Sequence, residues 1–97
     1  GGSENLIQGL ISLVESLGLE AAVEQELISI LDTASLKLDS VDELENDKDV
    51  DNAIRDAQNK LNDFINKVKD LQENKKITKK QGDLLISAAK SIIKQLS

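Results

Sequence analysis

The sequence predicts an all-α protein, and more specifically a small four-helix up-down bundle. The chain of 97 residues contains no proline, and its apolar residues are leucine, isoleucine, alanine and valine, with Phe64 as the single aromatic residue. Such residues recur every three or four positions in four separate segments, which is the spacing of amphipathic helices. Short connections between helices favour antiparallel neighbours. Since one core commonly serves about 100–150 residues, we expect a single domain.

The first helix is predicted over residues 4–17. Ser3 or Asn5 can cap its start, and Gly18 suits the left-handed conformation that often ends a helix. Gly9 lies inside this helix, where glycine costs about 1 kcal/mol relative to alanine unless a neighbouring helix packs close against it. The apolar face of the segment consists of Leu6, Ile7, Leu10, Ile11, Leu13, Val14 and Leu17.

The second helix is predicted over residues 20–38, with an acidic stretch behind it. Residues 39–51 contain seven acidic side chains and one lysine, with few apolar residues between them. We interpret this stretch as an acidic connector whose last residue, Asp51, caps the next helix. The apolar face of the second helix consists of Val23, Leu27, Ile30, Leu31, Ala34 and Leu38.

The third and fourth helices are predicted over residues 51–72 and 79–96. The third has the clearest periodicity of the chain and is centred on Phe64. Thr78 and Gln81 have the spacing of a capping box that opens the fourth helix. Gly82 lies in the first turn of that helix, where a close approach of another backbone segment would explain the absence of a side chain.

The residue types that the chain lacks argue against catalysis. There is no Cys, His, Met, Trp or Tyr, and therefore no thiol nucleophile, no imidazole base and no zinc site of the usual kind. Acidic pairs such as Asp42 and Glu43 would need a cleft and aromatic sugar platforms to act as a glycosidase pair, and one phenylalanine does not supply these. We predict that the protein is not an enzyme and uses no cofactor.

The acidic connector contains the only candidates for a metal site. Asp47, Asp49 and Asp51 stand at alternate positions, as do the first oxygen ligands of an EF-hand loop. Such a loop also needs glycine at its sixth position and a bidentate glutamate at its twelfth, where this chain has Asn52 and Gln58. These aspartates are therefore weak calcium candidates, and a solvated acidic loop is the alternative.

Charge is distributed unevenly along the chain. Residues 1–52 carry two lysines and thirteen acids, a net charge of 2 − 13 = −11, whereas residues 53–97 carry ten bases and five acids, a net charge of 10 − 5 = +5. The basic turn, residues 67–80, could bind a polyanion or could be a solvated tip. With few arginines and no interleaved aromatic residues, we expect no nucleic-acid partner. The interaction candidates are Lys67, Lys75, Lys76, Lys79 and Lys80.

Nearly the whole chain after residue 3 resembles the FIMAH domain. Residues 10–38 are similar to the opening helix pair of that family, and the more specific motifs lie in the second half of the chain. The resemblance lies in Phe64-Ile65 followed by Val68, in Lys75-Lys76-Ile77-Thr78, and in the closing helix with Leu84, Leu85, Ile86, Ala88 and Ala89. That family has a "FIxxV" helix, a "GKKIT" or "GKKLT" turn and an "A-x-x-L-I-x-x-A" helix. Asn74 replaces the usual glycine of the turn, as the next-best left-handed residue. The resemblance implies an accessory domain of exported multidomain proteins in bacteria and archaea, without catalytic residues.

Several functions remain open at this point. We expect a non-catalytic accessory or interaction module, a spacer or docking domain, that is outside the cell or at its surface and belongs to a longer polypeptide. Its partner would be a protein or a cell-surface polymer, without membrane insertion. The alternatives are a module that binds Ca²⁺ through the connector or a polyanion through the basic turn, and an intracellular helical regulator. Residues 1–3, Gly-Gly-Ser, have the composition of a cloning remnant.

Overall fold

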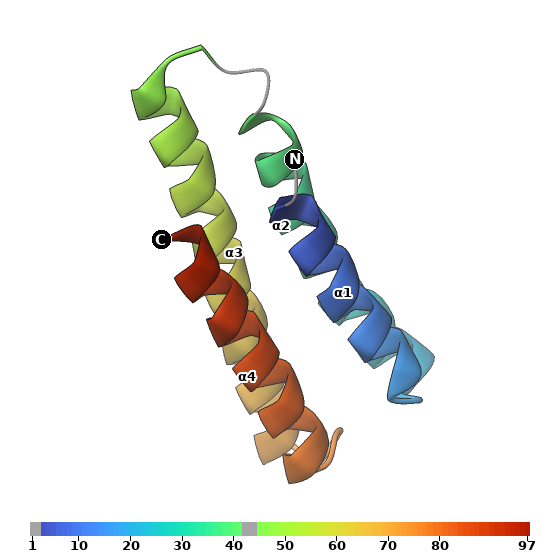
Figure 1. The fold of residues 1–97 in the computed structure, drawn as a ribbon. Helices are drawn as coiled ribbons and strands as arrows, with labels where there is room; N and C mark the ends of the chain where they lie inside the picture. Colours follow the sequence, from blue (N-terminus) through green and yellow to red (C-terminus); the bar gives the residue numbers. More distant parts are fainter. Residues whose placement is uncertain (1–2, 42–44) are drawn as a thin grey trace.

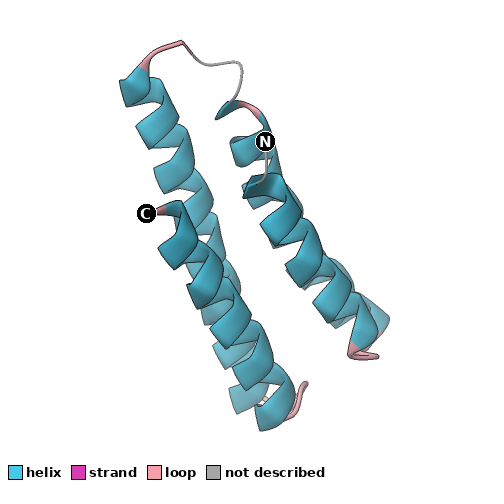
Figure 2. Cartoon of the chain, viewed as in Figure 1, coloured by secondary structure: helices cyan, strands magenta, loops and turns pink. Residues whose placement is uncertain are grey.

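A computed structural model describes residues 3–41 and 45–97, and over these ranges the chain folds into four α-helices and no strand (Figures 1 and 2). The helices are α1 (Ser3–Ser16), α2 (Ala21–Asp39), α3 (Asp47–Glu73) and α4 (Lys79–Leu96). The predicted all-α four-helix bundle is therefore confirmed. The predicted bounds of α4 agree with the structure, and those of α1 and α2 differ by one residue at each end.

The four helices form an up-down ring. Each helix packs against the next one along the chain, and α4 returns to pack against α1. Of these four neighbouring pairs, α1 and α4 pack the least closely. The result is a rod of 44 × 18 × 17 Å, in which the start of α1 and the end of α4 lie toward one end, and the α1–α2 and α3–α4 turns lie at the other (Figure 1). We call the latter the turn end.

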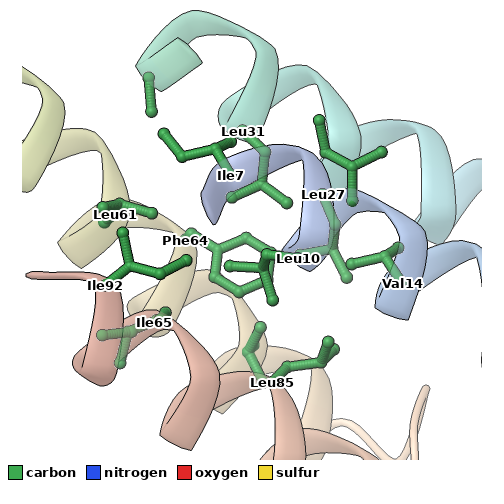
Figure 3. Close-up of a cluster of buried hydrophobic side chains, with 14 of the residues drawn as sticks. Ile7, Leu10, Val14, Leu27, Leu31, Leu61, Phe64, Ile65, Leu85 and Ile92 are labelled. Carbon is green, nitrogen blue, oxygen red and sulfur yellow. The ribbon is translucent and has the colours of Figure 1, made fainter. Parts of the chain in front are cut away.

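The core runs along the axis of this rod. Phe64 is fully buried at its centre, surrounded by aliphatic side chains from all four helices (Figure 3). Ser35 is the only buried polar residue in the described part of the chain. The fully buried large side chains are those of Phe64, Ile7, Leu27, Leu31, Leu61, Leu85, Val14 and Val68.

The start of α3 corrects one prediction. The helix begins at Asp47 rather than at residue 51, and its N-cap is Asn46, not Asp51. The Asn46 carboxamide oxygen accepts hydrogen bonds from the backbone N–H groups of Lys48 (2.8 Å) and Asp49 (3.4 Å). Asp47 and Asp49 then lie in the first helical turn, where negative charge is favoured by the helix dipole. Part of the acidic run is therefore helix, and residues 42–44 of the predicted connector lie outside the described residues.

The helices differ in length, so the two ends of the bundle differ too. α3 has 27 residues and α4 has 18, and α3 extends beyond the end of α4 (Figure 1). Gln58 of α3 marks the level at which α4 ends, because its Nε2 donates to the Ile93 carbonyl and to Ser97 Oγ, both at 3.2 Å. No helix in the described ranges is long and apolar enough to cross a membrane.

Candidate interaction site

The basic turn begins where α3 ends, and two hydrogen bonds close its backbone. The N–H of Lys76 donates to the Leu71 carbonyl (2.9 Å), and the N–H of Lys75 donates to the Gln72 carbonyl (3.1 Å). This pattern is a Schellman motif, which requires a left-handed residue just after the C-cap. Lys75 takes that conformation, with φ 59°. The expectation that Asn74 would do so is wrong, because Asn74 is the C-cap, with φ −87°.

The start of α4 is fixed by the predicted capping box and by an unpredicted bond to α1. Gln81 N–H donates to Thr78 Oγ1, and Thr78 N–H donates to Gln81 Oε1, both at 3.0 Å. The carboxamide nitrogen of Gln81 also donates to the Leu17 carbonyl at 3.3 Å. One side chain therefore caps α4 and satisfies a carbonyl that follows α1. This contact joins the two turns of the turn end.

Gly82 is explained by Gln72. Gly82 is buried, and a Cβ at this position would overlap the carboxamide of Gln72. Gln72 Nε2 donates to the Lys79 carbonyl (2.9 Å) and to Asp83 Oδ1 (3.2 Å), which holds α3 against the first turn of α4. A close approach to Gly82 is present, but the prediction that a backbone segment makes it is wrong, because the approaching group is the side chain of Gln72.

Four of the five predicted interaction lysines gather at the turn. We call them the turn lysines: Lys75, Lys76, Lys79 and Lys80, all exposed. Lys79 Nζ lies 3.5 Å from Asp83 Oδ2, a pair in which both side chains are more than half exposed. The other three make no ion pair with any described residue.

Lys67 lies on the face formed by α2 and α3, where its charge is paired. Its Nζ lies 3.2 Å from Glu26 Oε2 of α2, so its charge is paired across the α2–α3 face. Shallow grooves run along this face on both sides of the ion pair, and Ala22 lies in each of them. One groove reaches Lys76 at the turn end. Lys67 therefore differs from Lys75, Lys76 and Lys80 in being paired, although it lines the same groove as Lys76.

The calcium candidates do not converge. Asp47, Asp49 and Asp51 are exposed near the start of α3, the first two of them in its first turn. Because residues two apart on a helix point to nearly opposite sides, Asp49 faces away from the other two. Within residues 3–41 and 45–97, no group of three acidic side chains is arranged to hold a metal ion.

The turn end offers ammonium groups on a rigid support. Each turn lysine presents three hydrogen-bond donors and a positive charge, which suits carboxylate, sulfate or phosphate groups. At the α4 N-terminus the capping box engages the backbone N–H groups of Thr78 and Gln81. The roles of Gln72 and Glu26 were not predicted, because they depend on which helices are neighbours and no local sequence pattern encodes that.

Comparisons with known proteins do not extend this description. No protein-family model matches the chain, and no curated protein or solved structure gave a significant match.

Proposed function

We propose that this chain is a non-catalytic accessory module of a larger exported protein, and that its turn end is the docking end. The observation that carries the proposal is where the two chain ends and the turn lysines lie along the rod. The start of α1 and the end of α4 both point away from the turn end, toward the end of the rod at which α3 begins, and the turn lysines lie at the turn end (Figure 1). A module joined to a larger protein through its chain ends would present these lysines outward.

The surface chemistry supports docking in preference to catalysis. All charged side chains described are at least partly exposed, and the buried residues are apolar apart from Ser35. Catalytic acids, bases and nucleophiles usually lie in a cleft that desolvates them. The hollows around Lys67 and around Leu84 are shallow and lined by surface residues. The resemblance to FIMAH domains supports an extracellular or cell-surface location.

A polyanion-binding module is the second candidate, and the exposed turn lysines favour it. Its binding would weaken as salt is added, because contacts between exposed charges are screened over about 8–10 Å at moderate ionic strength. A docking partner with an apolar contact surface would bind with little salt dependence. The two candidate functions therefore differ in the salt dependence of binding, which one titration at low and high salt measures.

The test is an NMR titration of the chain with poly-L-glutamate and with dextran sulfate, at low and high salt. We expect amide shifts confined to residues 74–80, lost in the double variant Lys75→Gln, Lys76→Gln. The matched control is Lys90→Gln, Lys94→Gln, which removes the same charge from exposed α4 positions away from the turn. Shifts that the control abolishes equally would refute the turn end as the docking end. Persistence of the shifts at high salt would refute the polyanion candidate.

The location is tested separately. In the organism that produces the full-length protein, we expect an antibody or protease added to intact cells to reach this module. Protection from both in intact cells, with access only after lysis, would contradict export.

A further inference from the structure

An exposed leucine lies beside the turn lysines. Leu84 is 47% exposed, and Leu36, at 67%, is the only other large apolar side chain in the described ranges with such exposure. A shallow hollow covers this part of α4, and its lining residues are Lys79, Lys80, Asp83, Leu84 and Ser87. The turn end therefore combines an apolar surface and a cationic surface in one place.

The charges next to the two exposed leucines are opposite in sign. Lys80 precedes Leu84 by four residues in α4, so the two side chains are neighbours on the helix surface. Leu36 has Asp32 at the same spacing in α2, and Asp39 follows it by three residues. An acidic ligand is therefore favoured beside Leu84 and disfavoured beside Leu36.

The one carboxylate that lines the hollow is already engaged within the fold. Asp83 Oδ1 accepts a hydrogen bond from Gln72 Nε2 (3.2 Å), and Asp83 Oδ2 lies 3.5 Å from Lys79 Nζ. Lys80 makes no ion pair with any described residue, and residues 74–82 contain four lysines and no acid. The charge that the hollow offers to a ligand is therefore positive.

We propose that the docking partner binds the turn end through an acidic peptide segment that carries one leucine-sized side chain. Its carboxylates pair with the turn lysines, and its apolar side chain covers Leu84. This inference rests on the proposed docking function and adds the chemistry of the partner. A sulfated polysaccharide could pair with the lysines but has no aliphatic side chain to cover Leu84, so the exposed leucine favours a peptide.

The spacing of Lys80 and Leu84 sets the spacing within the segment. Four residues of α-helix separate the two positions, which is a rise of about 6 Å. An extended peptide advances about 3.3 Å per residue, so an acidic residue and an apolar residue two positions apart match this distance. Because short peptides rarely form stable helices alone, we expect the segment to bind in an extended form.

An NMR titration of the complete chain with two capped peptides tests the proposal. The first peptide contains four glutamates, a glycine and a leucine, in that order, and the second has serine in place of the leucine. We expect the leucine peptide to bind about 3–10-fold more tightly, because part of its side chain leaves water. It should shift the amides of Leu84 and Ser87 in addition to those of residues 74–80. Added salt should weaken both peptides and preserve their ratio, because only the charged contacts are screened.

Two leucine variants locate the apolar contact. Leu84→Gln should lower the affinity for the leucine peptide to that for the serine peptide, and should leave the serine peptide unaffected. Leu36→Gln is the matched control and should change neither affinity. Both positions are exposed, so both variants should fold, which circular dichroism checks. A preference for leucine that survives Leu84→Gln, or that Leu36→Gln abolishes, would overturn the proposal.

The same titration distinguishes failure of this inference from failure of the proposed docking function. Equal affinity of the two peptides, with shifts confined to residues 74–80, would disprove the apolar contact, point to a polyanion as the ligand and leave the turn end as the docking end. If neither peptide, poly-L-glutamate nor dextran sulfate shifts residues 74–80, both the inference and the docking end are wrong.

Discussion

Replacing Gly82 with alanine should have two opposing effects on stability: it raises the helix propensity at this position, and it breaks the hydrogen bonds of Gln72. Alanine inside a helix is favoured over glycine by about 1 kcal/mol. The added methyl would overlap the Gln72 carboxamide, which must then leave the Lys79 carbonyl and Asp83. Two hydrogen bonds at about 0.5–1.5 kcal/mol each are lost, with the low end favoured because both are exposed. The net result is a variant that is less stable by about 0–1 kcal/mol.

The sign of the effect should reverse when Gln72 is removed. In a Gln72→Ala background nothing opposes the methyl, and Gly82→Ala should stabilise the fold by about 1 kcal/mol. The coupling energy of the double-mutant cycle is then about 1–2 kcal/mol. Because the chain has no tryptophan or tyrosine, unfolding is best followed by circular dichroism of the helices. A change of 1 kcal/mol moves Tm by about 4–8 °C in a domain of this size.

One result would refute this reasoning. If Gly82→Ala changes stability by the same amount in both backgrounds, within about 0.3 kcal/mol, the two residues are independent. Gln72 would then not be the reason for glycine at position 82.

Two further predictions concern the turn and the core. Lys75→Gly should stabilise the fold by about 1 kcal/mol in urea unfolding, because glycine takes the left-handed conformation without the cost that a Cβ adds. Lys75→Ala removes the same charge and should give no such gain, so an equal gain from alanine would contradict the Schellman explanation. Phe64→Ala should cost about 3–5 kcal/mol in the same assay, because the ring is fully buried at the bundle centre. A cost below about 1 kcal/mol would mean that the core closes around the gap.

The helices were predictable because each carries a complete local signal. The spacing of apolar residues defined four amphipathic segments, and the Thr78–Gln81 capping box located the start of α4, which the structure confirms. The predicted start of α3 was wrong because the acidic residues before it were interpreted as a connector. Asn46 caps the helix there, and Asp47 and Asp49 are stabilised by its dipole. A cap followed by acids is itself a helix-start signal, so this information was present in the sequence.

The interaction site was less predictable, because it depends on which helices are neighbours. Sequence proximity grouped Lys67 with the turn lysines, and Lys67 does line the same groove as Lys76, but the sequence did not show that Glu26 of α2 pairs with it. The second bond of Gln81, to the Leu17 carbonyl, spans 64 positions in the chain. The left-handed residue was predicted one position too early. Asparagine favours this conformation, so Asn74 was chosen, but the hydrogen bonds of the turn and the positive φ identify Lys75.

Because α3 extends beyond α4, the two ends of α3 should differ in how easily they unfold locally. Residues preceding the level of Gln58 have no α4 beside them, whereas Leu61 to Leu71 are enclosed by helices and held at the turn by Gln72 and Gln81. Backbone amides near the start of α3 should therefore exchange their hydrogens through local fraying, and those of the enclosed segment only when the whole domain unfolds. Within α3, the protection of backbone amides against hydrogen exchange should therefore rise from the start of the helix toward the turn end.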